Sequence, residues 1–204
     1  MPESSLARSS GSTSSSLLER AKARDPEAWE RLVKLYSPLV YYWCRSPHVK
    51  PEDAADLLQE VFRSVAGAIG RFNYNEEHDS FRGWLRTITQ NKLRNYLRKQ
   101  RDAADTVGGS AAYEQLLAIS DPLADSSTGA GAREQSEVVL LCQKALELVR
   151  AEFEERSWQA FWQVTIEGKF PADVAAYLGI STAAVYKAKS RVMARLREEL
   201  GERF

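Results

Sequence analysis

The chain has few of the residues on which metal sites, disulfide scaffolds and many enzymes depend. Among its 204 residues there are 2 cysteines and 2 histidines. Cys44 and Cys142 lie far apart in the sequence and neither belongs to a CxxC pair, so a disulfide framework and a zinc site are both unfavoured, as in proteins of a reducing cytosol. His78 has no companion at metal-ligand spacing. The sequence therefore predicts no metal and no cofactor.

The sequence also lacks a transmembrane segment, a secretion signal and recognisable catalytic motifs. No run of about 18 apolar residues occurs, so no transmembrane helix is expected. The serine-rich segment 1–16 lacks the apolar core of a secretion signal and is predicted to be a disordered tail. We found neither a glycine-rich phosphate loop nor a nucleophile paired with a base, which argues against an enzyme. A cytoplasmic protein without membrane contact is expected.

Helical periodicity accounts for most of what is present. Apolar residues recur at helical spacing through two blocks, residues 17–101 and 136–204, and no period-two strand pattern of useful length is found. Ser37-Pro38 is predicted to kink or restart a helix in the first block. Residues 102–135 between the blocks hold several acids and only one base, Arg133. The prediction is an all-α chain of two small helical bundles joined by a flexible acidic linker.

The second block ends in a pattern typical of a helix-turn-helix. A short helix is predicted over Pro171–Leu178, a turn at Gly179, and a longer helix from Ser181 to about Leu200 that contains no acid before Glu198. Such a helix suits the major groove, with short side chains for base edges and cations for phosphates. A solvated basic helix in an ordinary bundle is the alternative. The predicted DNA-contacting residues are Ser181, Thr182, Ala184, Lys187, Lys189, Arg191 and Arg195.

The first block combines an acidic stripe with a basic helix. In the helix that begins at Pro51, the side chains of Asp56, Gln59, Glu60 and Arg63 lie on one face because they are three or four positions apart. Taken alone, this stripe is more typical of a solvated face.

The following helix has no acid from Arg82 to Arg101, and amides and arginines of this kind read base edges and hold phosphates. Aromatic and amide residues in the preceding loop suit unpaired bases, although Phe72 and Tyr74 could instead close the bundle. The predicted residues for this surface are Phe72, Asn73, Tyr74, His78, Gln90, Asn91, Arg94, Asn95 and Arg98.

Three motifs together resemble the bacterial RNA polymerase sigma factors. Asp53–Phe62 resembles their polymerase-binding signature, and Phe81–Leu85 followed by residues 91–101 resembles the helix that reads the minus-ten promoter element. The helix-turn-helix resembles their domain for the minus-thirty-five element. Since only these two domains are seen, the chain is most similar to the minimal, extracytoplasmic-function group.

This resemblance implies functions for each part. Residues 17–101 would be a region 2-like domain and residues 136–204 a region 4-like domain. The polymerase-binding residues would be Asp53, Asp56, Gln59, Glu60 and Arg63. The expected function is to bind core RNA polymerase, direct it to specific promoters and help melt the minus-ten element. The expected partners are core RNA polymerase, promoter DNA as duplex and melted strand, and an anti-sigma protein.

Other classes of protein remain open from the residues alone. An ordinary helix-turn-helix regulator would bind duplex DNA by itself, usually as a dimer on a palindrome, but it would not need the second basic and amide face between Gln90 and Arg101. Asp53 and Asp56 could serve as paired carboxylates of an enzyme, on weak support. An adaptor or anti-sigma-like interaction protein is the third alternative, and two basic surfaces count against it.

Overall fold

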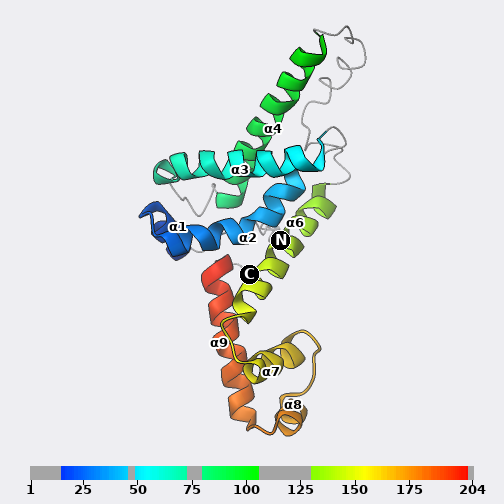
Figure 1. Cartoon of the computed structure of the whole chain (residues 1–204). Coiled ribbons are helices and arrows are strands. Elements are labelled where there is room, and N and C mark those ends of the chain that lie inside the picture. The colour runs from blue at the N-terminus through cyan, green and yellow to red at the C-terminus, as the bar shows by residue number, and fades with distance from the viewer. Residues whose placement is uncertain (1–14, 46–48, 73–79, 106–129, 202–204) are drawn as a thin grey trace, which may run out of the picture.

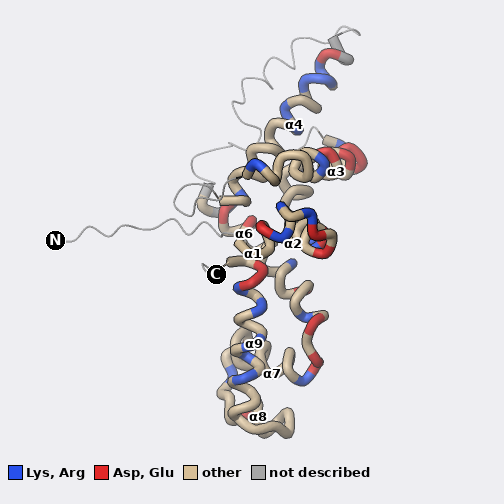
Figure 2. Tube along the Cα trace, turned by 90° about the vertical axis from the view of Figure 1, so that its left-hand side faces the viewer, with Lys and Arg blue, Asp and Glu red and all other residues tan. Residues whose placement is uncertain are grey.

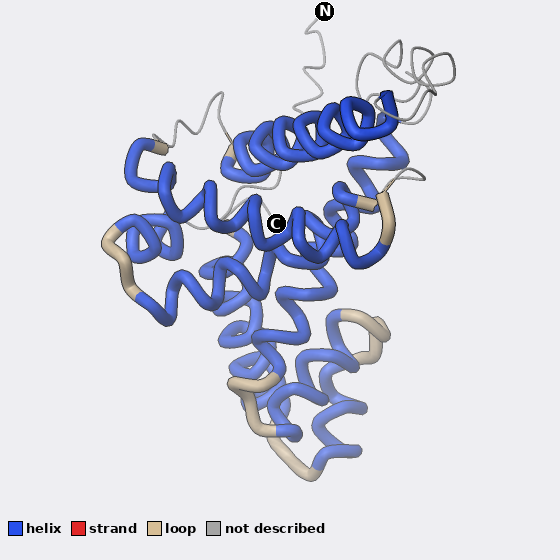
Figure 3. Tube along the Cα trace, turned by 45° about the horizontal axis from the view of Figure 1, so that its top comes forward, coloured by secondary structure: helices blue, strands red, loops and turns tan. Residues whose placement is uncertain are grey.

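The computed structural model describes residues 15–45, 49–72, 80–105 and 130–201. Every regular element in these ranges is a helix (Figure 3), which confirms the all-α prediction. The helices are α1 (Ser15–Lys22), α2 (Pro26–Cys44), α3 (Pro51–Ala68) with the 3-10 turn η1 (Ile69–Arg71), α4 (Phe81–Asp105), α6 (Ala130–Arg150), α7 (Glu155–Thr165), α8 (Pro171–Leu178) and α9 (Thr182–Leu200). No helix in the described ranges is long and apolar enough to span a membrane.

Helix α2 shows how local sequence and packing share control of the fold. Asp25 caps its start, since Oδ1 of its side chain accepts hydrogen bonds from the backbone N–H groups of Glu27 at 2.9 Å and Ala28 at 3.2 Å. The helix does not restart at Pro38 but continues through it to Cys44. Tyr36 and Leu39 are buried on either side of the proline, so packing holds the helix together despite the missing backbone donor.

Helices α1 to α4 form the first half of the molecule around an aromatic and aliphatic core. The ring centroids of Tyr36 and Phe81 lie 5.1 Å apart, edge to face. Trp43 and Leu85 are fully buried in the same core. The core is built from α2, α3 and α4, so the faces of α3 and α4 that point away from it are the ones available to other molecules (Figure 1).

The predicted ends of the linker and of the tail are corrected by the structure. Residues 102–105 belong to α4 and residues 130–135 to α6. Alanine, arginine and glutamate in these segments favour a helix, although the acidic composition of residues 102–135 predicts a linker. Ser15 and Ser16, assigned to the tail, form the first turn of α1. The rest of the predicted tail and linker, and the loop residues 73–79, lie outside the described residues.

The two halves pack on each other, which the sequence did not indicate. Leu141 and Ala145 of α6 and Leu200 of α9 belong to the same buried cluster as the core of the first half. Figure 1 shows α6 and α9 side by side beneath α2. Smaller clusters hold α7, α8 and α9 together further from this junction.

Candidate nucleic-acid interface

The predicted stripe on α3 points away from the core. Asp56, Gln59, Glu60 and Arg63 are exposed, while Leu57 and Val61 on the opposite face are buried. Glu60 lies 3.7 Å from Nζ of Lys92 on α4, as a half-exposed ion pair of the kind that contributes little to stability. The stripe therefore adds little to the packing of the core and is exposed to solvent or to another molecule.

Asp53 differs from the rest of the stripe because its carboxylate faces α4. Its Oδ2 accepts a hydrogen bond from the hydroxyl of Tyr96 at 2.7 Å, and Nε2 of Gln100 donates to the same hydroxyl oxygen at 3.0 Å. Burial, and then the hydrogen bond to Asp53, raise the pKa of Tyr96. The Asp53 side chain thus joins α3 to α4. Helical spacing alone did not predict that this carboxylate faces α4 instead of solvent.

The outer face of α4 carries amides and cations. Asn91, Arg94, Asn95 and Arg98 are exposed, and Gln90 is half-buried. Nη1 of Arg94 donates to Oδ1 of Asn91 at 3.4 Å. Figure 2 shows basic segments along α4 and acidic ones on α3. One bundle thus presents surfaces of opposite charge on two adjacent helices.

Phe72 is part of the core and does not belong to the predicted DNA surface. Its ring is 6% exposed, with its centroid 4.8 Å from that of Trp84 and 5.7 Å from that of Phe81. Nζ of Lys22 lies 5.9 Å from the ring centroid. The ring closes the bundle because Phe72 directly follows η1 and packs on rings from the first turn of α4. Asn73, Tyr74 and His78, predicted for the same surface, lie outside the described residues.

Acidic residues of α6 pair with arginines in the first two turns of α4. Nη2 of Arg82 lies 3.2 Å from Oε1 of Glu134, and Nη1 of Arg86 lies 3.7 Å from Oε1 of Glu137. That same Glu137 oxygen accepts a hydrogen bond of 2.8 Å from the indole nitrogen of Trp43. Acids that the sequence placed in or near a linker therefore neutralise the start of the basic helix.

The second half contains the predicted helix-turn-helix. Gly179 ends α8 in the left-handed conformation, with φ of 64° and ψ of 38°. Ser181 caps α9 by accepting a hydrogen bond from the backbone N–H of Ala184 at 3.2 Å. Val185 and Ala188 pack into the small core between the helices. These contacts fix α9 with its opposite face toward solvent.

Two of the four cations predicted on α9 to contact DNA are exposed. Thr182, Lys187 and Arg191 are exposed, whereas Ala184 and Lys189 are half-buried. The guanidinium carbon of Arg191 lies 5.6 Å from the ring centroid of Phe153, and the side chain still reaches solvent.

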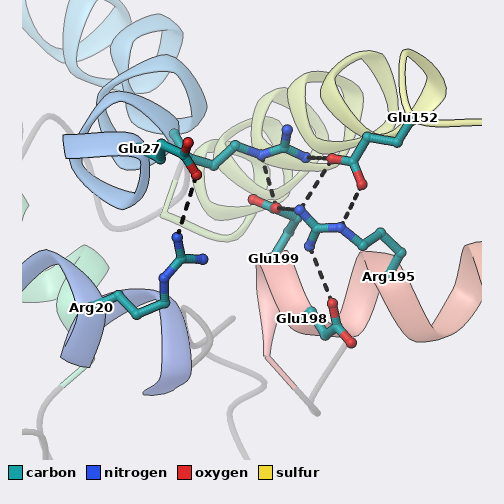
Figure 4. Close-up of polar contacts among 7 residues, drawn as sticks. Arg20, Glu27, Glu152, Arg195, Glu198 and Glu199 are labelled. Atoms are coloured by element: carbon teal, nitrogen blue, oxygen red, sulfur yellow. Dashed lines mark hydrogen bonds and ion pairs between the residues drawn. The ribbon is translucent and has the colours of Figure 1, made fainter. Parts of the chain in front are cut away.

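Arg195, also predicted to contact DNA, is instead bound by acids (Figure 4). Its guanidinium makes two hydrogen bonds to Glu152, at 2.6 and 3.1 Å, and lies 2.6 Å from Oε1 of Glu199. Burial acts to lower the pKa of Arg195, but the hydrogen bonds and the attraction of Glu152 and Glu199 outweigh it and raise that pKa. The sequence did not indicate the pairing with Glu152, because the two residues are distant along the chain, and the DNA contact of Arg195 stays a prediction.

Exposed aromatic side chains are the feature that sequence reasoning missed. Phe170 and Tyr177 are each 77% exposed, and Tyr186 of α9 is 56% exposed. Large exposed aromatics are more informative than exposed small residues about where a protein meets other molecules. Helical spacing gave no clear signal for them, because Tyr177 lies only three positions from the buried Val174 and Tyr186 directly follows the buried Val185.

Comparisons with known proteins agree with the arrangement of the first half. Residues 32–103 match the family model for sigma-70 region 2. The chain is 32% identical over 149 residues to the probable RNA polymerase sigma factor RfaY of Xanthomonas campestris pv. campestris, covering 73% of this chain and 34% of that protein. It is 31% identical over 93 residues to the ECF RNA polymerase sigma factor BldN of Streptomyces coelicolor, covering 46% of this chain and 34% of that protein. The chain thus spans about a third of the length of the curated relatives it matches.

Two solved structures are similar at low superposition scores. The RsbN–BldN complex matches with a TM-score of 0.34 and 19% identity, over 88% of this chain and 96% of that chain. CnrH in complex with the cytosolic domain of CnrY matches with a TM-score of 0.35 and 20% identity, over 88% of this chain and 92% of that chain. In its region 2 match and its sequence relatives, this chain is similar to RNA polymerase sigma factors, one of them of the ECF group.

Proposed function

We propose that this chain binds core RNA polymerase, directs it to specific promoters and helps melt the minus-ten element, without itself making or breaking a covalent bond. The observation that carries the proposal is the pair of outward faces on α3 and α4. Within the segment that matches region 2, Asp56 and Gln59 are exposed on α3, while Asn91, Asn95 and Arg98 are exposed on α4.

The outward stripe of α3 is assigned to the polymerase. Asp56, Gln59, Glu60 and Arg63 mix both charges with an amide, which favours a polar partner surface over an apolar groove. Asp53 contributes indirectly, since its hydrogen bond to Tyr96 holds α3 against α4. Residues 17–101 would act as the region 2-like domain of the family.

The two DNA surfaces are assigned to α4 and α9. On α4, Asn91, Asn95 and Arg98 would contact unpaired minus-ten bases and the adjoining phosphates. On α9, Thr182 lies at the N-terminal end that enters a major groove, and Lys187 and Arg191 reach phosphates or guanine. Residues 136–204 would act as the region 4-like domain, with the acidic segment 102–135 linking the two.

The energy for melting comes from differential binding. A surface that binds the unpaired strand and not the paired one shifts the equilibrium toward the open bubble, with no chemical step. Anchoring on duplex DNA through α9 raises the effective concentration of α4 at the minus-ten element. This division of labour accounts for two separate cationic surfaces on one chain.

The test is co-elution of the purified full chain with sigma-free core RNA polymerase. The test variant, Asp56→Ala with Gln59→Ala, removes two exposed side chains of α3. The matched control, Glu30→Ala, removes an exposed acid of α2 whose partner is Lys34. We expect the wild type and the control to co-elute with the polymerase, and the folded double variant to elute alone.

Two results would contradict the proposal. Co-elution of the folded double variant at wild-type affinity would remove the α3 stripe from the polymerase interface. Failure of the wild type to bind core polymerase, with tight binding to duplex DNA on its own, would favour an ordinary helix-turn-helix regulator.

A further inference from the structure

We infer that Tyr186 determines part of the promoter sequence preference, by placing its ring against the 5-methyl group of a thymine in the major groove. This inference rests on the proposed function and deepens it, since it names the base that one residue of α9 reads.

The exposure of Tyr186 is the first observation. The side chain is 56% exposed although it is aromatic. Within the described ranges, its ring makes no contact with another ring and its hydroxyl makes no hydrogen bond with another residue. Phe170 and Tyr177 are also strongly exposed but belong to the start and the end of α8. Tyr186 is thus the exposed aromatic of α9 among the described residues.

The position of Tyr186 on the helix is the second observation. Ala183, Tyr186, Lys187 and Ser190 follow the spacing i, i+3, i+4 and i+7, so they form one outward patch. All four are exposed, while Val185, Ala188 and Val192 on the opposite face are buried. Ala183 and Ser190 are small, so the ring of Tyr186 projects from the patch. A helix lying in the groove with this face inward brings that ring to the base edges.

The chemistry of the groove selects the base. A phenol ring offers one polar atom and a broad apolar surface, whereas guanine, cytosine and adenine present only donors and acceptors along the major groove. Thymine also presents a methyl group, the apolar feature that a ring can cover. The tyrosine hydroxyl then reaches a phosphate oxygen or O4 of the thymine.

Lys187 supports this orientation of the helix. Its ammonium group is exposed beside Tyr186, and α9 carries no acid between Thr182 and Arg197 that would repel the DNA. Phosphate contacts fix the position of a protein on the duplex, and base contacts specify the sequence. Lys187 would therefore supply positioning, and Tyr186 selectivity.

The experiment uses holoenzyme reconstituted from the full chain and core RNA polymerase. Promoter duplexes are selected from a randomised library by the wild type, Tyr186→Ala and Tyr186→Phe. Each thymine in the wild-type consensus is then replaced by deoxyuridine, which lacks only the 5-methyl group. Tyr177→Ala, which removes an exposed aromatic of α8, is the matched control.

We expect deoxyuridine at one position to weaken wild-type binding about fourfold, the ratio that corresponds to about 0.8 kcal/mol for one buried methyl group. Tyr186→Phe and Tyr177→Ala should keep that sensitivity, and Tyr186→Ala should lose both the sensitivity and the thymine preference. Equal sensitivity in the wild type and Tyr186→Ala would overturn the inference. So would a variant that only weakens holoenzyme formation, which would place Tyr186 against the polymerase.

A failure of the proposed function gives a different result. In that case the wild type forms no holoenzyme and selects no promoter sequence, and the inference fails with it. A holoenzyme that selects promoters identically with and without the Tyr186 ring overturns the inference alone.

Discussion

Arg31 and Glu199, which lie 168 positions apart, form an ion pair between the two halves of the molecule, with 2.8 Å between Nε of the arginine and Oε1 of the glutamate. The Glu199 side chain is 2% exposed and that of Arg31 is 21% exposed. Glu152 and Arg195 extend the pair into a network of α2, α9 and the turn after α6. Oε2 of Glu199 accepts no hydrogen bond from the described residues.

The first prediction concerns this pair. Each single change removes one charged hydrogen bond and leaves the other residue a second partner, since Glu199 keeps Arg195 and Arg31 keeps Glu152. Arg31→Met and Glu199→Leu should therefore each lower the free energy of unfolding by about 1–3 kcal/mol. The double variant should cost less than the sum, because the bond between the two residues is then lost only once. Urea unfolding of the four proteins measures this cycle. Lys34→Ala, at an exposed pair on α2, should change stability by less than about 1 kcal/mol. Strict additivity of the two single changes would contradict the prediction.

The second prediction separates two arginines of α9. Arg191 is exposed, so Arg191→Ala should weaken holoenzyme binding to promoter duplexes. If the lost contact is to phosphate, the loss should be similar on all sequences and the slope of log affinity against log salt should fall by about one. Arg195→Ala should leave that slope unchanged and lower stability instead, because its guanidinium is bound by Glu152. A lower salt slope for Arg195→Ala would return that residue to the DNA surface.

The third prediction is an acid-side loss of stability at the start of α2. The hydrogen bond from Arg20 and those from the backbone of Ala28 and Glu27 hold the pKa of Asp25 below its ordinary value of 3.8. A lowered folded pKa means that the contribution is complete above pH 3.8 and is lost as the pH falls through the folded value. Asp25→Asn keeps a capping oxygen and should flatten this part of the stability curve. Urea midpoints measured from pH 5 downward test it, and identical curves for both proteins would disprove it.

The fourth prediction concerns the two thiols. Burial raises the pKa of Cys44 to about 12 and also raises the pKa of Cys142, which is less enclosed. Since the thiolate is the reactive form, iodoacetamide at pH 8 should modify Cys142 slowly and Cys44 only on unfolding. Peptide mass analysis with and without urea measures both rates. Rapid modification of Cys44 in the folded protein would show that the core of the first half opens readily.

The sequence by itself determined the helical class and most of the local structure. Helical periodicity, the Asp25 cap, the Gly179 turn and the Ser181 cap each depend on residues a few positions apart. The sequence can therefore predict them without knowledge of the tertiary structure. The outward faces of α3 and α4 followed from the same helical repeat, and their motifs carried the resemblance to sigma factors.

Only the tertiary structure decided which of the predicted residues are buried or paired with other residues of the chain. Phe72 is buried against Trp84, Arg195 is held by Glu152, and Trp43 donates to Glu137 from 94 positions away. Helical periodicity specifies the direction of a side chain around its own helix and carries no information about which distant helix covers it. Burial and ion pairing between the two halves depend on how the whole chain packs, and that packing separated the core residues from those that stay exposed.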